Sequence, residues 1–561
     1  MNLMKTRPKL SFIWLLLIGV LLPIINIEDI FRYRFGDIKF AIYDMATSLL
    51  SIYYFYLKRE IRVRSIGLLV LLLLFLMIIS MVQSVNIGYS FVWLFRFFNT
   101  TILITLAYEL LRNGEIELKW FNNLIFISSF IFLIYYLYGV YFNIFGSRQA
   151  FSPIGHVNYT AQVLDVWIPL LLLNFYIQKN SFFKYFSLIL MFFLVDTLLV
   201  SMIRGSILGL VLSEIVVILL LFIKDRRVVI YPIITLSLIL FFLLHKAFAP
   251  STIEKHVDKN VALPSDIIAI DTQTINRVSA NRLNIYNNTI DMIVDNPFGV
   301  GIGNFEYIHP KYAKVGTPYA TNYVNEFEVF TNPHNIILNF TSELGWIGGS
   351  LFISILIIFI KMAISNLWYG EKEDYIIAMA FFANLVHSML SAIFLTPVNL
   401  FFVSLLLAIL IYRYFNRVNR KLYFSFKIGC FRILFLFIPL YFSTFYLSKY
   451  YCNQFTVQRE FEYIQKAILF NPFNEYAYLK YARYEAYADR DYSLAIYFIN
   501  KNLKLYPYSI NALIKKASFE YRLKRYKNAQ KTINRLLLID KSNKKMLKLR
   551  NKIKLLERDK L

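Results

Sequence analysis

The chain has 561 residues, of which 58% are hydrophobic and only 17% are charged. A soluble protein of this size needs far more polar surface to cover its cores, so the composition excludes a soluble globular enzyme. The formal net charge is +25; the C-terminal tail carries more than half of it, and much of the rest lies in short loops between apolar blocks, where membrane topology explains it. We therefore expect membrane lipids or an anionic glycan as partners, and no nucleic acid.

Apolar blocks of about 17–25 residues recur along the chain, which is the length that crosses roughly 30 Å of hydrocarbon as a helix. Backbone polar groups in lipid must be satisfied internally, so these blocks are predicted to be helices. The first block follows Lys5, Arg7 and Lys9 as in a signal peptide, but no small-residue cleavage site follows it, and we interpret it as a retained span. The predicted spans lie near 11–27, 38–57, 65–85, 90–111, 121–142, 157–177, 182–201, 205–223, 228–248, 346–363, 375–395, 399–413 and 428–448.

The charges in the loops give these spans a direction. With the N-terminus in the cytoplasm, the short inside loops carry clusters of Lys and Arg. The one long outside loop, residues 249–333, carries 6 basic and 9 acidic residues. The positive-inside rule therefore predicts an extracytoplasmic loop, and the span count places the C-terminal tail on the same side. One span more or fewer would move the tail to the cytoplasm.

The tail, residues 451–561, is predicted to be a separate helical domain after a membrane domain of residues 1–450. It carries 24 Lys and Arg against 10 Asp and Glu. Pro472, Pro507 and Lys541 recur at a spacing of 34–35 residues, with aromatic and small residues recurring between them. A period near 34 with proline at the turn is typical of tetratricopeptide repeats, whose helical pairs stack to bury their apolar faces. A plain helical bundle is the alternative, and either form would offer a surface for a protein partner.

The segment "NPHNIILNFTSELGWIGG", Asn332 to Gly349, joins the long loop to an apolar span. His334 follows Pro333, as at the opening of a helix, and an imidazole at the membrane–water boundary can accept or give a proton. A single histidine is more often structural than catalytic. Glu343 lies nine positions further on the opposite helix face, so we expect it to have a packing or loop-holding role.

Two further segments carry arginines. Arg282 and Tyr286 lie one helical turn apart, before a Gly-x-Gly-x-Gly segment that is predicted to form a tight turn rather than a nucleotide loop. Arg204 lies at the outer junction of two spans, where snorkelling to lipid headgroups is its ordinary role. His156, in another short outside loop, has a structural role as its simplest interpretation.

Arg204, Arg282 and His334 all fall on the same predicted membrane face. Two guanidiniums suit a diphosphate, because each can hold phosphate oxygens bidentately, and a nearby histidine can take a proton from an attacking hydroxyl. No metal-ligand spacing occurs in the outside loops, so we expect neither a metal nor another cofactor, and arginine alone would stabilise a leaving diphosphate.

The pattern His334-Asn335…Glu343-x-Gly345…Gly348, with Arg282 and Arg204 upstream, resembles the O-antigen ligase and O-antigen polymerase superfamily over roughly residues 155–410. The apolar blocks predict an all-α polytopic protein of about 12–13 spans; the family usually has nearer 12, and the resemblance implies the bacterial cytoplasmic membrane. It also implies metal-independent transfer of a glycan from a polyprenyl-diphosphate carrier, such as undecaprenyl diphosphate, to an acceptor hydroxyl outside that membrane.

By the same resemblance, Arg204 and Arg282 bind the lipid diphosphate, His334 activates the acceptor, and Tyr286, Asn335 and Glu343 support them. The acceptor stays open, because relatives with repeat tails include polymerases and protein O-oligosaccharyltransferases as well as ligases that act on a lipid A core in lipopolysaccharide synthesis. A transporter or flippase of lipid-linked glycans is the alternative from another class. The ionisable residues Asp165 and His387 inside predicted spans would suit that function.

Overall fold

The computed structural model describes most of the chain. The described residues are 8–25, 37–57, 60–63, 65–141, 157–201, 203–224, 282–313, 331–391, 396–418, 424–427, 435–541 and 543–558, with a few single positions between them. The chain divides into two compact units, each assembled from separate stretches of sequence. Unit 1 comprises residues 1–71, 96–259 and 353–442, and unit 2 comprises residues 72–95, 260–352 and 443–561.

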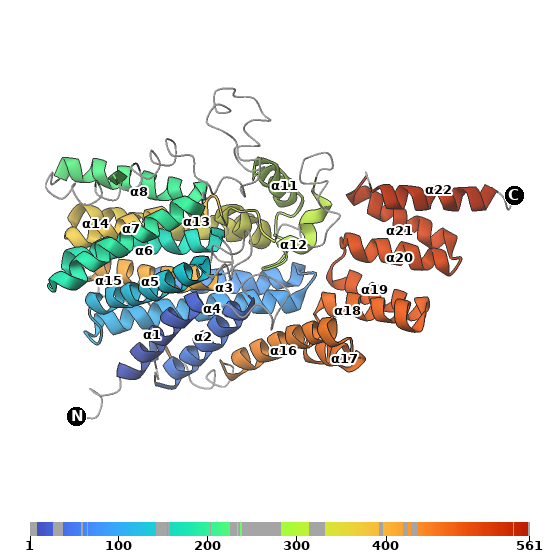
Figure 1. The fold of residues 1–561 in the computed structure, drawn as a ribbon, viewed down its shortest axis with the longest axis horizontal. Helices are drawn as coiled ribbons and strands as arrows, with labels where there is room; N and C mark the ends of the chain where they lie inside the picture. Colours follow the sequence, from blue (N-terminus) through green and yellow to red (C-terminus); the bar gives the residue numbers. More distant parts are fainter. Residues whose placement is uncertain are drawn as a thin grey trace, which may run out of the picture. The chain divides into compact units, whose positions relative to one another are not determined.

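Helices make up nearly all of the described structure, which confirms the predicted all-α class (Figure 1). The longer helices that follow the apolar blocks are α1 (Pro8–Ile24), α2 (Asp37–Leu57), α3 (Ser65–Ser80), α4 (Ile87–Arg112), α5 (Leu118–Tyr141), α6 (Val157–Ile177), α7 (Ser181–Ser201), α8 (Arg204–Lys224), α13 (Ile336–Tyr369), α14 (Lys372–Ser388), α15 (Pro397–Val418) and α16 (Phe437–Gln458). The exception to the all-α class is a short antiparallel pair in unit 1, β1 (Glu60–Val63) with β2 (Phe424–Lys427), in which Glu60 lies opposite Lys427.

Shorter helices build the described part of the long loop and the tail. Before α4 and in the loop these are η1 (Met81–Gln83), α11 (Arg282–Asp295), α12 (Phe305–Ile308) and η4 (His309–Lys311). In the tail they are α17 (Phe461–Phe470), α18 (Glu475–Tyr484), the π-helical turn η9 (Glu485–Asp489), α19 (Tyr492–Leu505), α20 (Ile510–Arg522), α21 (Tyr526–Ile539) and α22 (Lys544–Arg558).

Among the described residues, seven helices are long and apolar enough to cross a membrane: Ile66–Gln83, Ile87–Arg112, Leu118–Tyr138, Asn158–Ile177, Ser181–Leu199, Ile336–Tyr369 and Pro397–Val418. Two shorter apolar helices cover Ile13–Ile24 and Gly205–Leu219. The chain is therefore a multi-pass membrane protein. The span predicted at 228–248 lies outside the described residues, apart from isolated positions. The last predicted span, 428–448, overlaps α16, which begins at Phe437 and continues to Gln458, so the predicted domain boundary at residue 450 falls inside a helix.

Helix α8 packs closely against α14 in unit 1, because Gly205 and Gly209 of α8 let the two helices approach each other. A Cβ on Gly209 would lie 2.6 Å from the carbonyl oxygen of Ala383, and small residues serve this purpose at helix interfaces in membranes. At the same place the carboxylate of Asp165, on α6, is hydrogen-bonded to the Ser206 hydroxyl and to Nδ1 of His387 at 2.5 Å. All three polar side chains are buried, so one polar cluster joins α6, α8 and α14.

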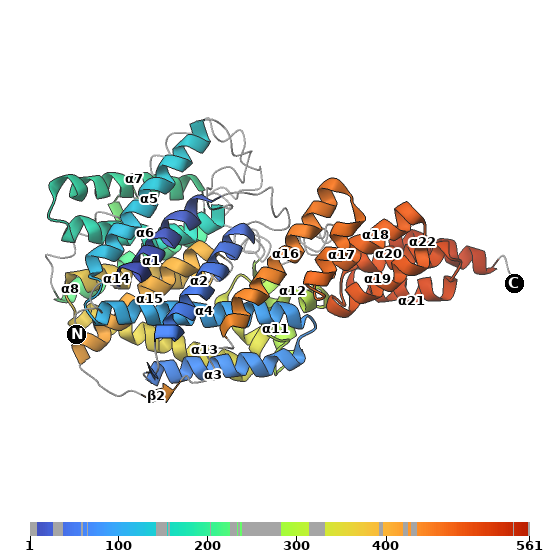
Figure 2. The same cartoon turned by 90° about the horizontal axis from the view of Figure 1, so that it is seen from below.

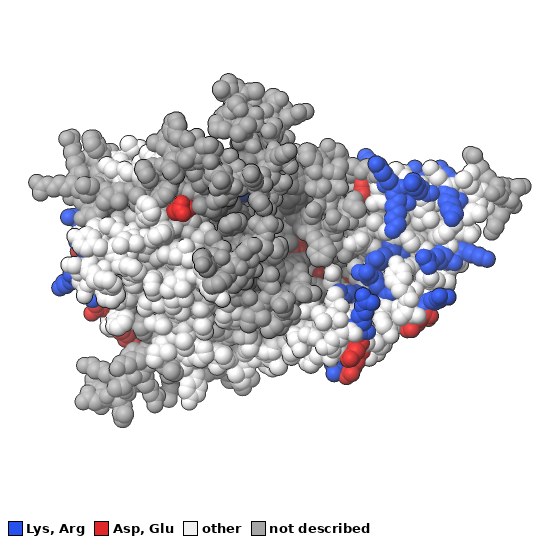
Figure 3. Space-filling model, viewed as in Figure 1, with Lys and Arg blue, Asp and Glu red and all other residues white. Residues whose placement is uncertain are grey.

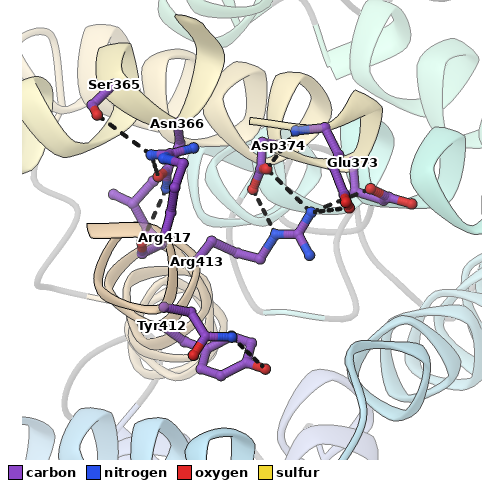
Figure 4. A network of polar contacts seen from close by, with 10 residues as sticks. Ser365, Asn366, Glu373, Asp374, Tyr412, Arg413 and Arg417 are labelled. Carbon is purple, nitrogen blue, oxygen red and sulfur yellow. Dashed lines mark hydrogen bonds and ion pairs between the residues drawn. The ribbon is translucent and has the colours of Figure 1, made fainter. Parts of the chain in front are cut away.

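Arg413 holds the corner between α13 and α14 against the end of α15, also within unit 1 (Figure 4). Its guanidinium donates to Asp374 at 2.7 Å, to Glu371 at 3.1 Å and to Glu373 at 3.2 Å. Asp374 is only 4% exposed, so the cation compensates a carboxylate that is largely removed from water. One turn further, Arg417 donates to the side-chain oxygen of Asn366.

The tail is a stack of helices within unit 2, with neighbouring helices joined by short turns (Figures 1 and 2). Asn474, Ser509 and Asn543 each cap a helix by accepting from the backbone N–H three residues ahead, at 3.2, 3.3 and 3.1 Å. These caps recur at the 34–35-residue spacing that the sequence predicts. Ala482, Ala517 and other small and aliphatic side chains are buried between the helices. The assignment to the tetratricopeptide family stays a prediction.

Candidate functional site

Helix α11 and the start of α13, both in unit 2, bring four of the predicted site residues together. Arg282 is the first residue of α11, and the hydroxyl of Tyr286, one turn on, donates to the main-chain carbonyl of His334 at 3.4 Å. Burial raises the pKa of Tyr286, whereas the positive charge of Arg282 and a hydrogen bond with the Asn335 side chain act in the opposite direction. All four side chains are only partly buried, so the cluster combines protein contacts with access from outside.

His334 has a left-handed backbone conformation with φ at 54°. For a residue with a Cβ this conformation costs about 1–2 kcal/mol, and such strain is concentrated at functional sites. Hydrogen bonds of neighbouring residues stabilise this backbone conformation. The His334 N–H donates to Oδ1 of Asn332 at 2.9 Å, and Oδ1 of Asn335 accepts from the N–H of Leu338 at 3.0 Å. Asn335 therefore caps α13, and His334 lies just before the helix rather than in its first turn.

The Gly-x-Gly-x-Gly segment forms a turn, as the sequence predicts. Gly299, Gly301 and Gly303 have φ values of 82°, 92° and 75°, a region that only glycine adopts readily. A Cβ on each would also collide with a neighbour: the Glu343 carbonyl for Gly299, Ser84 for Gly301 and the Trp93 ring for Gly303. The turn is therefore packed between the start of α13 on one side and the connection from α3 to α4 on the other.

Glu343 binds this turn rather than His334. The backbone N–H groups of Gly303 and Phe305 donate to its carboxylate, the latter at 3.4 Å, and its own carbonyl accepts from the N–H of Gly301 at 3.0 Å. Two residues on, Gly345 has φ 71° and breaks α13, and this break lets the N–H of Trp346 reach the carbonyl of Pro297 at 3.0 Å. The break follows Glu343, so it does not turn that carboxylate toward His334.

Comparison with known protein families gives a match at residues 189–353 with the family described as O-antigen ligase. Residues 189–353 are therefore similar to the O-antigen ligase family. No curated protein matches the chain at a significant level. The ligase match contains Arg204, Arg282, His334 and Glu343, and it is shorter than the stretch of 155–410 over which the sequence resembles this family.

Arg204, the remaining predicted site residue within the ligase match, is the first residue of α8 in unit 1. Arg204 thus belongs to a different compact unit from Arg282 and His334, and its role stays a prediction. His156 lies outside the described residues. Among the residues that the structure describes, no three His, Cys, Asp or Glu side chains lie close enough together to hold a metal ion.

A junction within unit 2 joins the tail to the described part of the long loop, and the sequence alone did not predict it. Glu475, at the start of α18, accepts from the Tyr307 hydroxyl at 3.3 Å and from Nδ2 of Asn86 at 3.2 Å. The backbone N–H of Asn86 donates to Oδ1 of Asn304 at 2.8 Å. Tyr307 also packs edge-on against Tyr506 of the tail, with ring centroids 5.1 Å apart. The glycine turn, the α3–α4 connection and the first tail helices are thus parts of one structure.

Proposed function

We propose that this protein transfers a glycan from a polyprenyl-diphosphate carrier to an acceptor hydroxyl, without a metal ion, on the extracytoplasmic face of the bacterial cytoplasmic membrane. The observation that carries this proposal is the partly buried cluster of Arg282, Tyr286, His334 and Asn335 within the ligase match. It combines a permanent cation, a proton acceptor and two groups that fix their geometry.

In the proposed reaction, the His334 imidazole accepts the proton of the acceptor hydroxyl while the hydroxyl oxygen forms a bond to the anomeric carbon of the glycan. The bond from that carbon to the carrier's diphosphate oxygen breaks, and the diphosphate leaves with the electron pair. The Arg282 guanidinium stabilises the negative charge that develops on this leaving group. Arg204 is proposed separately to contribute a second guanidinium.

Tyr286 and Asn335 are proposed as positioning residues. The Tyr286 hydroxyl bonds the main chain of His334 and the side chain of Asn335, so it links the arginine-bearing helix to the histidine-bearing segment. The left-handed backbone at His334 keeps this residue outside the helix that follows it. A Tyr286→Phe change is expected to lower the turnover number while leaving the histidine itself in place.

The test compares His334→Ala and Arg282→Ala with the wild-type protein in membranes that contain a lipid-linked glycan donor. Loss of a general base lowers the rate by about 10²–10⁴-fold, and both variants should retain expression and insertion. Lys311→Ala is the matched control, because Lys311 is an exposed cation of the same loop whose partners are Asp295 and Tyr312. Normal transfer by both His334→Ala and Arg282→Ala would overturn the proposal.

The acceptor is identified by the products that a deletion strain fails to make. Loss of chain length indicates a polymerase, loss of glycan from lipid A indicates a ligase, and unglycosylated secreted protein indicates a protein O-oligosaccharyltransferase. Lipid-linked glycan left on the outer leaflet agrees with transfer, whereas glycan left on the cytoplasmic leaflet would indicate a transporter instead.

We also propose that the tail lies on the same side of the membrane as the glycine turn. In support, Asn86, which precedes α4, is hydrogen-bonded both to Asn304 in the loop and to the tail at Phe473 and Glu475. Helix α4 is long and apolar enough to span a bilayer, so its start and its end are expected on opposite sides. The positive-inside rule places its start outside.

Single-cysteine labelling with a membrane-impermeant maleimide tests this arrangement. Gln83→Cys lies before α4, Glu115→Cys lies after it and Leu538→Cys lies in the tail, and all three positions are exposed. Intact cells should label Gln83→Cys and Leu538→Cys alike, and should label Glu115→Cys only after the membrane is permeabilised. A tail cysteine that behaves like Glu115→Cys would place the tail in the cytoplasm.

A further inference from the structure

The end of the tail carries a large excess of positive charge. Residues 510–556, which cover α20, α21 and most of α22, contain 15 Lys and Arg but only two acidic residues, Glu520 and Asp540. Both acids are buried, at 5% exposure each, and Glu520 accepts a hydrogen bond from Thr532 inside the stack. The exposed Lys and Arg side chains of residues 522–554 are here called the cationic face, and within residues 510–556 no exposed acidic side chain lies among them.

The cations are arranged in rows. Lys527 and Lys531 on α21, and Lys544 and Lys548 on α22, are each four positions apart and exposed. Side chains four positions apart lie on the same helix face, about 6 Å apart along the axis. Like charges at this spacing destabilise a helix, each pair by about 0.2–0.5 kcal/mol. Figure 3 shows Lys and Arg side chains gathered over this part of the tail. These rows of like charge lower the stability of the folded tail, and a binding function would explain why they are present.

Aromatic rings lie among these cations. The Arg522 guanidinium lies over the ring of Tyr492 at 5.2 Å, and Lys552 lies over the ring of Tyr521 at 5.4 Å. Both rings are only partly buried. Sugar rings pack their C–H faces on aromatic side chains, so a surface that combines tyrosine with cations suits a sugar that carries negative charge.

Most large apolar side chains of α20 to α22 are buried in the core of the tail and do not contribute to the cationic face. Leu513, Phe519, Ile533, Leu536 and Ile553 are buried in the core of the stack. Within the described part of α20 to α22, the exposed large hydrophobic residues are Leu538 and Leu555. A helix that lies on a bilayer needs a continuous apolar face to insert beneath the headgroups. The cationic face lacks one, which favours a dissolved polyanion over a lipid surface.

We infer that the cationic face binds an acidic glycan chain, with carboxylates or phosphates along its length. The inference rests on the proposed function, since it takes the bound acidic glycan to be the glycan that the protein transfers or extends. The tail junction places the cationic face in the same compact unit as the Arg282–His334 cluster. A bound chain would therefore be held close to the protein between successive transfer events.

The experiment measures binding without any donor lipid. The full chain is placed in nanodiscs of zwitterionic lipid and titrated with oligogalacturonate, and separately with a neutral maltooligosaccharide of the same length. Lys527→Gln/Lys531→Gln/Lys548→Gln removes three charges from the cationic face and keeps good helix formers. Lys466→Gln/Lys501→Gln/Lys504→Gln is the control, with three charges removed from α17 and α19.

The acidic oligosaccharide should bind and the neutral one should not. The triple change on the cationic face should weaken binding about tenfold and the control should not, with binding falling as salt screens the charges. Equal binding of acidic and neutral sugars, or equal loss in both triple variants, would overturn the inference. So would binding to phosphatidylglycerol vesicles without binding to the oligosaccharide. His334→Ala should bind the acidic oligosaccharide like the wild type. The binding result can therefore be interpreted even if the proposed transfer activity is wrong.

Discussion

Gly303→Ala tests whether the glycine turn supports the site. Gly303 has φ 75°, and a Cβ added there would collide with the ring of Trp93. Gly114, in the connection between α4 and α5, has nearly the same φ of 69° but nothing within 4 Å of an added Cβ. The two glycines therefore share the backbone conformation and differ in their surroundings, so Gly114→Ala is a matched control.

The expected cost can be separated into two parts. A left-handed conformation costs alanine about 1–2 kcal/mol relative to glycine, and the stiffer unfolded chain returns about 0.4–1 kcal/mol of this. Both variants share that balance, so Gly114→Ala should destabilise by about 1 kcal/mol or less. Gly303→Ala adds overpacking against Trp93, which costs about 1–3 kcal/mol in a packed site. The difference between the variants should therefore be about 2 kcal/mol.

Thermal unfolding in detergent and the rate of glycan transfer measure this difference. At about 2 °C per kcal/mol, the midpoint of Gly303→Ala should fall about 4 °C further than that of Gly114→Ala. Transfer should decrease only for Gly303→Ala, because its turn is bound to Glu343 at the start of α13. Equal midpoints and equal transfer rates for the two variants would refute the reasoning.

Three further predictions concern other parts of the chain. Burial lowers the pKa of His309 from 6.5 to about 4, so the unfolded chain takes up its proton first, and the contribution of His309 to stability should fall by about 3 kcal/mol as the pH drops from 6.5 to 4; denaturant titrations measure this contribution as the difference between the wild type and His309→Phe over that range. Arg413→Gln leaves the buried Asp374 without its cation, which should cost about 1–3 kcal/mol in thermal unfolding without changing turnover. Glu475→Gln weakens the tail junction by about 1 kcal/mol, so amide exchange in residues 299–305 should accelerate, whereas Glu462→Gln, which alters only an exposed pair with Lys466, should leave it unchanged.

The helical architecture was predictable because apolar blocks of spanning length admit few structures in lipid. Twelve of the thirteen predicted spans overlap a helix of the described residues, and the thirteenth, 228–248, lies outside them apart from isolated positions. One deviation concerns the span predicted at 346–363, which belongs to a helix that begins at Ile336. The polar residues before Gly345 lowered the local hydropathy and hid that first part. Gly345 itself separates the two parts, so the predicted start lies next to the break.

The site was predictable only where its residues are neighbours in sequence. Arg282 with Tyr286, and His334 with Asn335, form two local pairs, and the sequence alone did not show that the Tyr286 hydroxyl joins them. The left-handed backbone of His334 was also unforeseen, because proline before histidine suggests a helix start. The tail junction links Asn86 to Glu475 across 389 positions, and single polar residues carry no signal for such a contact.

The first turns of α13 contact both the strained backbone at His334 and the glycine turn. The first turns of α13 carry the cap Asn335 beside His334 at one end and Glu343, bound to the turn, at the other. The turn continues into Tyr307, which contacts Tyr89 at the start of α4 and Tyr506 and Glu475 in the tail. Among the described residues, the turn and α13 therefore give a route by which a change at the tail junction can reach His334. For this reason a Glu475 variant that slows transfer should loosen residues 299–305 as well, whereas a variant of the cationic face that slows transfer should leave them unaltered.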